Sequence, residues 1–328
     1  MDPTFSYTSK DTLFSGALSP KLDRWSLGTI SGDVYMFQKG IEEPQKITFS
    51  SGSVRSIEYD SKGENLISGD KSGNIFLTNI ETLDNSVSIK RAHHDSIECI
   101  RFLSESVIVS GDTGGYLKIW DLRTTKATQT YRYEQDYISD IAVVNETSFV
   151  STNGIGCANV IDSRSAKRKQ YYVQEDDDFT TVAYMKFLNY AVIGSSKPKI
   201  YVTRYPSLDY ICESPGNSKS PIVVMRSFDT ERNRAVIAQD DGSVCILEIS
   251  PNKSVVAFKA HKSDIIGGCL QGTTFMTWGN DSMAKIWDLS ELSKMQIEKD
   301  KSKRKKGKKF KNMGVKVRDH QDNFFSNY

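Results

Sequence analysis

Residues 110–121 read SGDTGGYLKIWD, a polar turn followed by a short strand that ends in Trp-Asp. Gly114 and Gly115 suit a tight hairpin because glycine adopts the positive φ angles that most residues avoid. Leu117 and Ile119 alternate with their neighbours at the period of a β-strand that has two different faces. The segment therefore predicts a β-hairpin with a partly buried second strand.

The same plan recurs along the chain. Residues 277–288 read TWGNDSMAKIWD and repeat both the turn and the terminal Trp-Asp. Weaker copies bring the total to seven, at intervals of 41, 42, 41, 42, 44 and 40 residues, and their turns are centred on Gly32, Gly73, Gly115, Gly156, Pro198, Gly242 and Ser282. This is the spacing of Trp-Asp (WD40) repeats, each of which supplies one four-stranded blade of a β-propeller.

We therefore predict an all-β fold, a seven-bladed WD40 β-propeller over residues 1–293, followed by a disordered, basic C-terminal tail over residues 294–328. The ring must close because a single repeat cannot bury its own faces. We expect residues 4–7 to pair as the outer strand of the last blade, which removes a free sheet edge. Residues 295–297 are the alternative for that position.

Composition disfavours several classes of protein. No run is apolar enough to span a membrane, and the first residues lack the form of a secretory signal. The five cysteines lie far apart without a Cys-x-x-Cys pair, which is typical of a reducing cytosolic or nuclear compartment and argues against a zinc module.

The charge is divided unevenly between body and tail. Residues 294–328 carry 12 Lys/Arg and 4 Asp/Glu, a net charge of +8, whereas the rest of the chain has a net charge of −6. An acidic body with a basic tail suggests two different partners, or one composite partner such as a ribonucleoprotein particle.

Four residues of the last repeat stand where Trp-Asp repeats place a hydrogen-bonded chain: His261, Thr277, Asp281 and Trp287. The indole N–H donates, the hydroxyl relays, the imidazole accepts and donates, and the carboxylate accepts. A catalytic dyad or a metal site is the alternative reading of the histidine and the aspartate. We favour a structural tetrad because the repeat itself explains their spacing.

The third repeat predicts only a partial tetrad. His93, Ser110 and Trp120 are present, but Gly114 stands where the carboxylate is expected. The chain has no phosphate-binding glycine loop, no serine nucleophile elbow and no His pair with metal-ligand spacing. We therefore predict that the protein is not an enzyme, and we expect no cofactor, metal or small-molecule substrate.

The tail is strongly basic between residues 299 and 311. It has too little apolar material to fold alone, so a merely solvated tail is the simplest interpretation. We favour a nuclear-localisation signal combined with RNA contact by charge, carried by Lys301, Lys303, Arg304, Lys305, Lys306, Lys308, Lys309 and Lys311. Phe324 and Phe325 follow as candidate docking anchors.

Several segments together resemble a known family. They are residues 31–37 (SGDVYMF), 111–115 (GDTGG), 136–140 (DYISD), 250–253 (SPNK) and the basic tail that ends in Asp-Asn-Phe-Phe at 322–325. The chain resembles the WD repeat-containing protein 55 family, eukaryotic nucleolar propellers linked to ribosomal RNA processing and large-subunit assembly. The tail is the most discriminating feature, because Trp-Asp propellers in general lack it.

The resemblance implies a non-catalytic scaffold in ribosome biogenesis, located in the nucleus and nucleolus. Its expected partners are pre-ribosomal proteins and assembly factors, with ribosomal RNA bound through the basic tail and no membrane partner. We expect a monomer within a large complex. Loop residues that are candidate contacts are Asp112, Thr113, Asp136 and Tyr137.

A second interpretation is a substrate receptor of a cullin-RING ubiquitin ligase. Trp120, Asp121 and Arg123 match the Trp-Asp-x-Arg box of receptors that bind the ligase's propeller adaptor, and residues 161–164 match it imperfectly. The guanidinium after the strand would be available for bidentate pairing. Such boxes also occur by chance in many Trp-Asp repeats.

Overall fold

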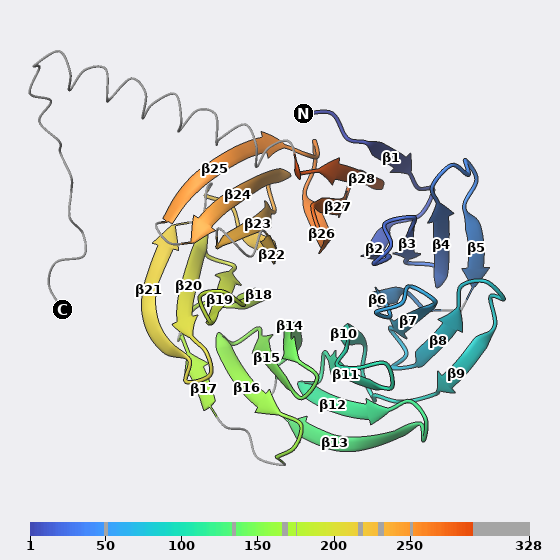
Figure 1. Ribbon diagram of the computed structural model, residues 1–328, viewed down its shortest axis with the longest axis horizontal. Coiled ribbons are helices and arrows are strands. Elements are labelled where there is room, and N and C mark those ends of the chain that lie inside the picture. Colours follow the sequence, from blue (N-terminus) through green and yellow to red (C-terminus); the bar gives the residue numbers. More distant parts are fainter. Residues whose placement is uncertain are drawn as a thin grey trace, which may run out of the picture. The chain divides into compact units, whose positions relative to one another are not determined.

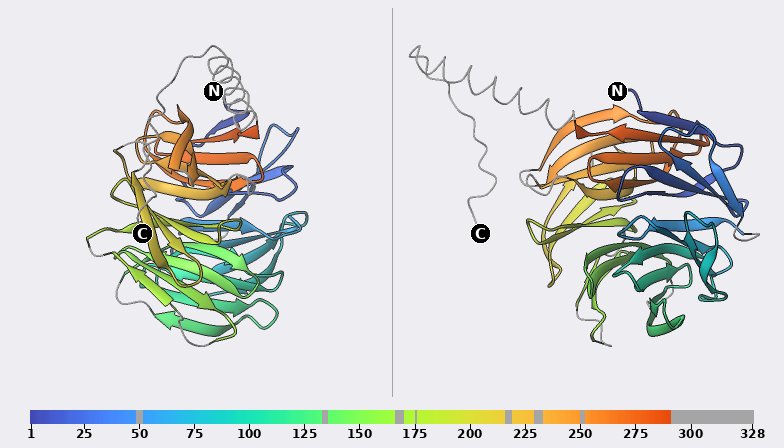
Figure 2. Two further views of the ribbon diagram at one scale, coloured as in Figure 1. Left: turned by 60° about the vertical axis from the view of Figure 1, so that its left-hand side comes forward. Right: turned by 45° about the vertical axis from the view of Figure 1, so that its right-hand side comes forward.

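The computed structural model describes residues 1–48, 52–132, 136–165, 170–174, 176–215, 219–228, 233–249 and 252–290. These residues form seven four-stranded antiparallel sheets arranged as the blades of a ring (Figure 1). The two additional views show neighbouring sheets stacked face to face around that ring (Figure 2). The predicted all-β, seven-bladed propeller is confirmed.

The first four blades follow one another in sequence. Blade 1 contains β2 (Leu13–Leu18), β3 (Arg24–Thr29), β4 (Asp33–Gln38) and β5 (Gln45–Thr48). Blade 2 contains β6 (Val54–Tyr59), β7 (Asn65–Asp70), β8 (Ile75–Asn79) and β9 (Asn85–Ile89). Blade 3 contains β10 (Ile97–Phe102), β11 (Val107–Asp112), β12 (Tyr116–Asp121) and β13 (Lys126–Arg132). Blade 4 contains β14 (Ile138–Asn145), β15 (Ser148–Asn153), β16 (Cys157–Asp162) and β17 (Gln170–Val173).

The remaining blades complete the ring. Blade 5 contains β18 (Phe179–Met185), β19 (Tyr190–Ser195), β20 (Lys199–Arg204) and β21 (Asp209–Pro215). Blade 6 contains β22 (Ile222–Phe228), β23 (Arg234–Gln239), β24 (Ser243–Ile249) and β25 (Asn252–Lys259). Blade 7 contains β26 (Ile265–Gln271), β27 (Thr274–Gly279) and β28 (Met283–Asp288), with β1 (Phe5–Thr8) as its outer strand.

The first strand of each blade lies nearest the axis of the ring (Figure 1). These inner strands are mostly buried, because each is sandwiched between two neighbouring blades. The apolar core therefore lies between sheets. Between blades 3 and 4, for example, Val109 and Leu117 pack in one cluster with Ile141 and Phe149.

The N-terminal strand closes the ring. Phe5 of β1 pairs with Ile286 of β28, and Thr8 pairs with Met283, in an antiparallel register. The predicted closure by residues 4–7 is thus confirmed. Residues 295–297, the predicted boundary at 293 and the tail lie outside the described residues.

The turn at residues 113–115 corrects one expectation. Only Gly115 has a positive φ, of 79°. Gly114 is needed for a different reason, because a Cβ there would lie 2.5 Å from a carboxylate oxygen of Asp95 in the preceding loop. The first glycine therefore permits a close approach, and the second permits the turn.

Candidate interaction surface and central channel

The last blade contains a continuous hydrogen-bonded chain. Trp287 Nε1 donates to Thr277 Oγ1 at 3.0 Å, and that hydroxyl lies 2.9 Å from His261 Nε2. His261 Nδ1 lies 3.0 Å from Asp281 Oδ1. The histidine is buried, and burial lowers its pKa in spite of the hydrogen bond to Asp281. This chain of hydrogen bonds ties the segment before β26 to β27, to the β27–β28 turn and to β28.

The third blade contains the same chain, with its carboxylate in a different place. Trp120 Nε1 donates to Ser110 Oγ at 2.9 Å, and Ser110 Oγ lies 2.7 Å from His93 Nε2. His93 Nδ1 lies 2.6 Å from Asp112 Oδ2. The expectation of a partial tetrad with Gly114 at the acid position was therefore wrong, because Asp112 supplies the carboxylate from the end of β11.

Asp112 is consequently not a surface contact. Its exposed fraction is 1%, and its other carboxylate oxygen accepts the backbone N–H of Tyr116 at 2.7 Å. The prediction that this residue is a loop contact was wrong. Its carboxylate is used inside the blade, where it caps the turn and holds the histidine.

The other predicted loop contacts lie at the same end of the strands, in the β11–β12 turn and just before β14. Thr113 is exposed, Asp136 is half-buried, and Tyr137 is exposed by 37%. The Tyr137 ring packs over Gly154, where a Cβ would lie 2.3 Å from ring atom Cε1. Ile155, the next residue, is exposed by 47%. We call Thr113, Asp136, Tyr137 and Ile155 the Tyr137 surface.

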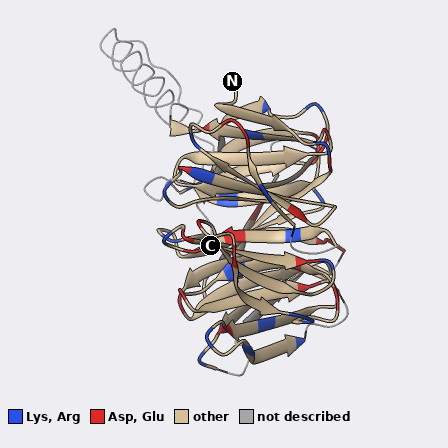
Figure 3. Ribbon diagram, turned by 90° about the vertical axis from the view of Figure 1, so that its right-hand side faces the viewer, with Lys and Arg blue, Asp and Glu red and all other residues tan. Residues whose placement is uncertain are grey.

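The Tyr137 surface is bordered by acidic groups. Burial raises the pKa of the Tyr137 hydroxyl, and the nearby carboxylates of Asp136, Asp178 and Glu98 raise it further. Acidic and basic residues are otherwise distributed over strands and loops throughout the ring (Figure 3). An exposed aromatic and an exposed aliphatic side chain with an acidic border form a surface suited to a basic protein partner.

The Trp-Asp-x-Arg box is only partly accessible. Trp120 is buried within its tetrad. The Arg123 side chain is 72% exposed, but its Nε and Nη2 donate to Asp121 at 2.9 and 2.6 Å. The same pairing recurs between Arg164 and Asp162 in the next blade. The guanidinium fork therefore already has an acidic partner within its own blade.

The basic residues of the tail and the aromatic pair Phe324 and Phe325 lie outside the described residues. The structure therefore adds nothing to the predictions for nuclear localisation, RNA contact and docking. No helix of the described chain is long and apolar enough to cross a membrane. No group of three or more potential metal ligands is found among the described residues.

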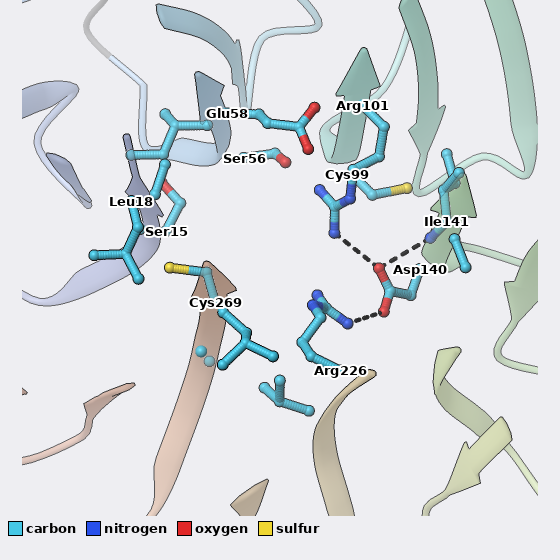
Figure 4. A pocket seen from close by; sticks show the side chains of 18 of the residues that line it. Ser15, Leu18, Ser56, Glu58, Cys99, Arg101, Asp140, Ile141, Arg226 and Cys269 are labelled. Atoms are coloured by element: carbon cyan, nitrogen blue, oxygen red, sulfur yellow. Dashed lines mark hydrogen bonds and ion pairs between the residues drawn. The ribbon is translucent and has the colours of Figure 1, made fainter. Parts of the chain in front are cut away.

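The inner strands enclose a channel whose charged groups the sequence analysis missed. Its cavity has a volume of about 450 Å³ and is lined by residues from all seven inner strands. Arg101 Nη2 donates to Asp140 Oδ1 at 2.9 Å, and Arg226 Nη1 donates to Asp140 Oδ2 at 2.7 Å (Figure 4). Thr181 Oγ1 also donates to Asp140 Oδ2, at 2.8 Å. One carboxylate thus links blades 3, 4, 5 and 6.

The electrostatics of this channel follow from burial and pairing. Burial alone would raise the pKa of Asp140, but the Arg226 and Arg101 guanidinium groups hold it below its ordinary value. Glu58 accepts the backbone N–H of Phe102 at 2.6 Å and interacts with the Arg101 charge at longer range. Burial raises the pKa of the Glu58 carboxyl. A sequence signal did exist, because charged residues interrupt four of the inner strands, β6, β10, β14 and β22.

Comparison with known proteins supports the predicted resemblance. No family model matches the chain. A WD repeat-containing protein 55 homolog of Drosophila mojavensis is 27% identical over 250 residues, which cover 75% of this chain and 49% of that protein. WD repeat-containing protein 55 of Danio rerio is 33% identical over 129 residues, which cover 38% of this chain and 33% of that protein. The chain spans about half the length of the curated relatives that it matches over 250 residues.

A solved structure supports the fold. A chain in the crystal structure of the mitotic checkpoint complex matches with a TM-score of 0.80, covering 88% of this chain and 95% of the other at 15% identity. At that identity the match establishes the propeller architecture alone. The sequence similarity confirms the resemblance to WD repeat-containing protein 55.

Proposed function

We propose that this chain, a WD-repeat propeller homologous to WD repeat-containing protein 55, is a non-catalytic scaffold in ribosome biogenesis, in rRNA processing and large-subunit assembly. The observation that carries the proposal is the similarity to those relatives over 75% of the chain. The tail supports it independently, because a net charge of +8 over residues 294–328 suits a phosphate-rich partner.

In this proposal the two parts of the chain have different partners. The propeller presents the Tyr137 surface to a basic ribosomal protein or assembly factor. The tail contacts rRNA or directs the protein to the nucleus and nucleolus. Phosphate contacts from lysine side chains add affinity with little sequence choice, so specificity has to come from the propeller.

The first test is a tagged pull-down of the full chain and of a chain that lacks residues 299–328. Bound RNA and protein are separated on a sucrose gradient. We expect the full chain to migrate with large-subunit precursors and the shortened chain to lose most of this association. Migration of neither chain with pre-ribosomal material would overturn the proposal.

A matched pair of variants tests the propeller's part. Tyr137→Ser combined with Ile155→Ser removes the apolar side chains of the Tyr137 surface, and we expect reduced recovery of pre-ribosomal proteins. Phe187→Ser is the control, because Phe187 is 71% exposed in the turn between β18 and β19, at the opposite face of the ring. Equal losses in both variants would contradict a specific role for the Tyr137 surface.

The same experiment addresses the ubiquitin-ligase interpretation. Recovery of a cullin adaptor without pre-ribosomal material would favour that function. Arg123→Ala then provides the decisive variant, because the box requires this guanidinium. Unchanged adaptor binding by Arg123→Ala would exclude the Trp-Asp-x-Arg box as the contact.

A further inference from the structure

Two arginines from opposite parts of the ring meet in the central channel. Arg101 extends from β10 in blade 3 and Arg226 from β22 in blade 6, and both guanidinium groups point toward Asp140 (Figure 4). Their side chains retain 19% and 26% exposure, while the Asp140 side chain retains 6%. The two cations are therefore accessible from the cavity, and the carboxylate between them is almost fully covered.

Both arginines have N–H groups that take part in no hydrogen bond within the described residues. A guanidinium group carries five N–H bonds in a planar fork. Within the described chain, all hydrogen bonds of Arg226 come from Nη1, which donates to Asp140, Thr181 and the Met225 carbonyl. Its Nη2 and Nε remain for a further acceptor. Arg101 uses Nη1 for the Ile100 carbonyl and Nη2 for Asp140.

Three arginines and three acidic residues line the channel, but they are not hydrogen-bonded one to one. Asp140 provides one carboxylate for two guanidinium groups. Glu58 uses a carboxylate oxygen for the backbone N–H of Phe102. Burial raises the pKa of this carboxyl, and the nearby charges of Arg101 and Arg226 lower it again. Arg55 and Glu98, the other charged lining residues, pair with each other at 3.2 Å. The formal charges therefore balance, but among the described residues the only carboxylate to which Arg226 hydrogen-bonds is that of Asp140.

We propose that the central channel is a binding site for a small phosphate-type anion, held between Arg101 and Arg226. Planar guanidinium forks match the oxygen spacing of phosphate groups. A cavity of about 450 Å³ accommodates such an anion together with water. The ligand accepts hydrogen bonds from the remaining N–H groups of the two arginines and links blades 3 and 6 across the channel. This inference is independent of the role in ribosome biogenesis.

Thermal unfolding of the full chain with inorganic pyrophosphate tests the site. The reference is sodium chloride at equal ionic strength. A ligand that binds only the folded state raises the unfolding midpoint with its concentration. The basic tail is present in every variant compared below, so any anion binding by the tail contributes equally to all of them. We expect a dose-dependent rise for the natural sequence.

Substitutions in the channel test whether the rise of the unfolding midpoint depends on the two arginines. Arg226→Met is expected to lose most of the rise. Arg226→Lys keeps a cation for Asp140 but loses the fork, so it provides a folded protein with a reduced rise if the methionine variant does not fold. Glu58→Gln is expected to retain or increase the rise, because it removes a competing carboxylate. Arg55→Gln, whose side chain pairs with Glu98, is the matched control and should keep the full rise.

Two results would overturn the proposal. One is a midpoint that rises no more with pyrophosphate than with sodium chloride. The other is an equal rise in the natural sequence and in Arg226→Lys and Arg226→Met, which would place anion binding elsewhere on the folded ring.

Discussion

Asp112 and Asp281 perform the same task from different positions in their turns. Asp112 ends strand β11 and also accepts the N–H of Tyr116, four residues later. Asp281 lies within the turn after β27 and accepts the N–H of Met283 at 3.1 Å. Each carboxylate therefore caps its own turn while it holds a histidine. The hydrogen bond to the histidine requires a carboxylate oxygen at one place. A residue at either of two positions in the turn can supply that oxygen.

This difference explains the incorrect assignment in blade 3. Counting from the tryptophan places Gly114 opposite Asp281, whereas the structure uses the last residue of the preceding strand. The better sequence signal is a polar residue at the end of the second strand of a blade. Its side chain accepts the backbone N–H of the residue four positions later. Asp70 and Asn153 do so for Asn74 and Cys157, at 2.8 Å each.

At the residue scale, the tetrad predicts the effect of His261→Ala. Removing the imidazole leaves Thr277 and Asp281 without their shared partner in a largely buried place. We expect the free energy of unfolding to fall by about 1–3 kcal/mol. Urea denaturation at pH 7.5 measures this value, and an unchanged midpoint would contradict the tetrad's contribution.

The pH dependence of stability in the same variant provides a second test of the tetrad. The pKa of His261 is lowered in the folded state, so the unfolded chain takes up a proton first as the pH falls. Stability should therefore be full above about pH 6.5 and fall below it, by up to about 1.4 kcal/mol per pH unit for each such histidine. His261→Ala should weaken this slope. His94→Ala, which removes a 94% exposed side chain, should not.

At the element scale, β1 joins the end of the ring to its beginning. It completes blade 7 by pairing with β28, and its side chains pack on blade 1. The Phe5 ring lies 4.7 Å from Trp25 and 5.4 Å from Phe37, centroid to centroid. The Tyr7 ring lies 4.8 Å from Phe37. These aromatic contacts make the closing strand part of two blades at once.

Phe5→Ala tests this closure. The ring is only half-buried, so the expected loss is about 1–3 kcal/mol, below that of a fully buried phenylalanine. Chemical denaturation gives the value. Ser6→Ala is the matched control, because Ser6 is exposed in the same strand and should change stability little. Equal effects of the two substitutions would mean that the aromatic contacts do not secure the closure.

Local sequence was sufficient to predict the elements of the ring. Turn residues at a regular spacing, together with two-residue alternation, determine strands and their order, so the seven blades and the closing strand were predictable. What the sequence could not provide was contact across the channel. Arg101 and Asp140 belong to neighbouring repeats, but Arg226 comes from blade 6 and meets them only because the ring closes.

At the scale of the whole molecule, Asp140 is the group on which four blades depend. Its two oxygens accept hydrogen bonds from Arg101, Ile141, Thr181 and Arg226. Removing the carboxylate leaves two guanidinium groups facing each other in a confined channel. Uncompensated buried charge is strongly destabilising, so Asp140→Ala should lower the free energy of unfolding by about 3–5 kcal/mol.

A compensated variant separates charge balance from geometry. Replacing Arg101 and Arg226 with methionine and Asp140 with leucine removes the three charged groups and leaves apolar side chains of similar size. Because pairing of buried ions gains little over apolar packing, this triple variant should approach the stability of the natural sequence in urea denaturation. Its thermal unfolding midpoint should also not rise with pyrophosphate. A triple variant as unstable as Asp140→Ala would show that the directed hydrogen bonds themselves, rather than charge balance, hold the four blades together.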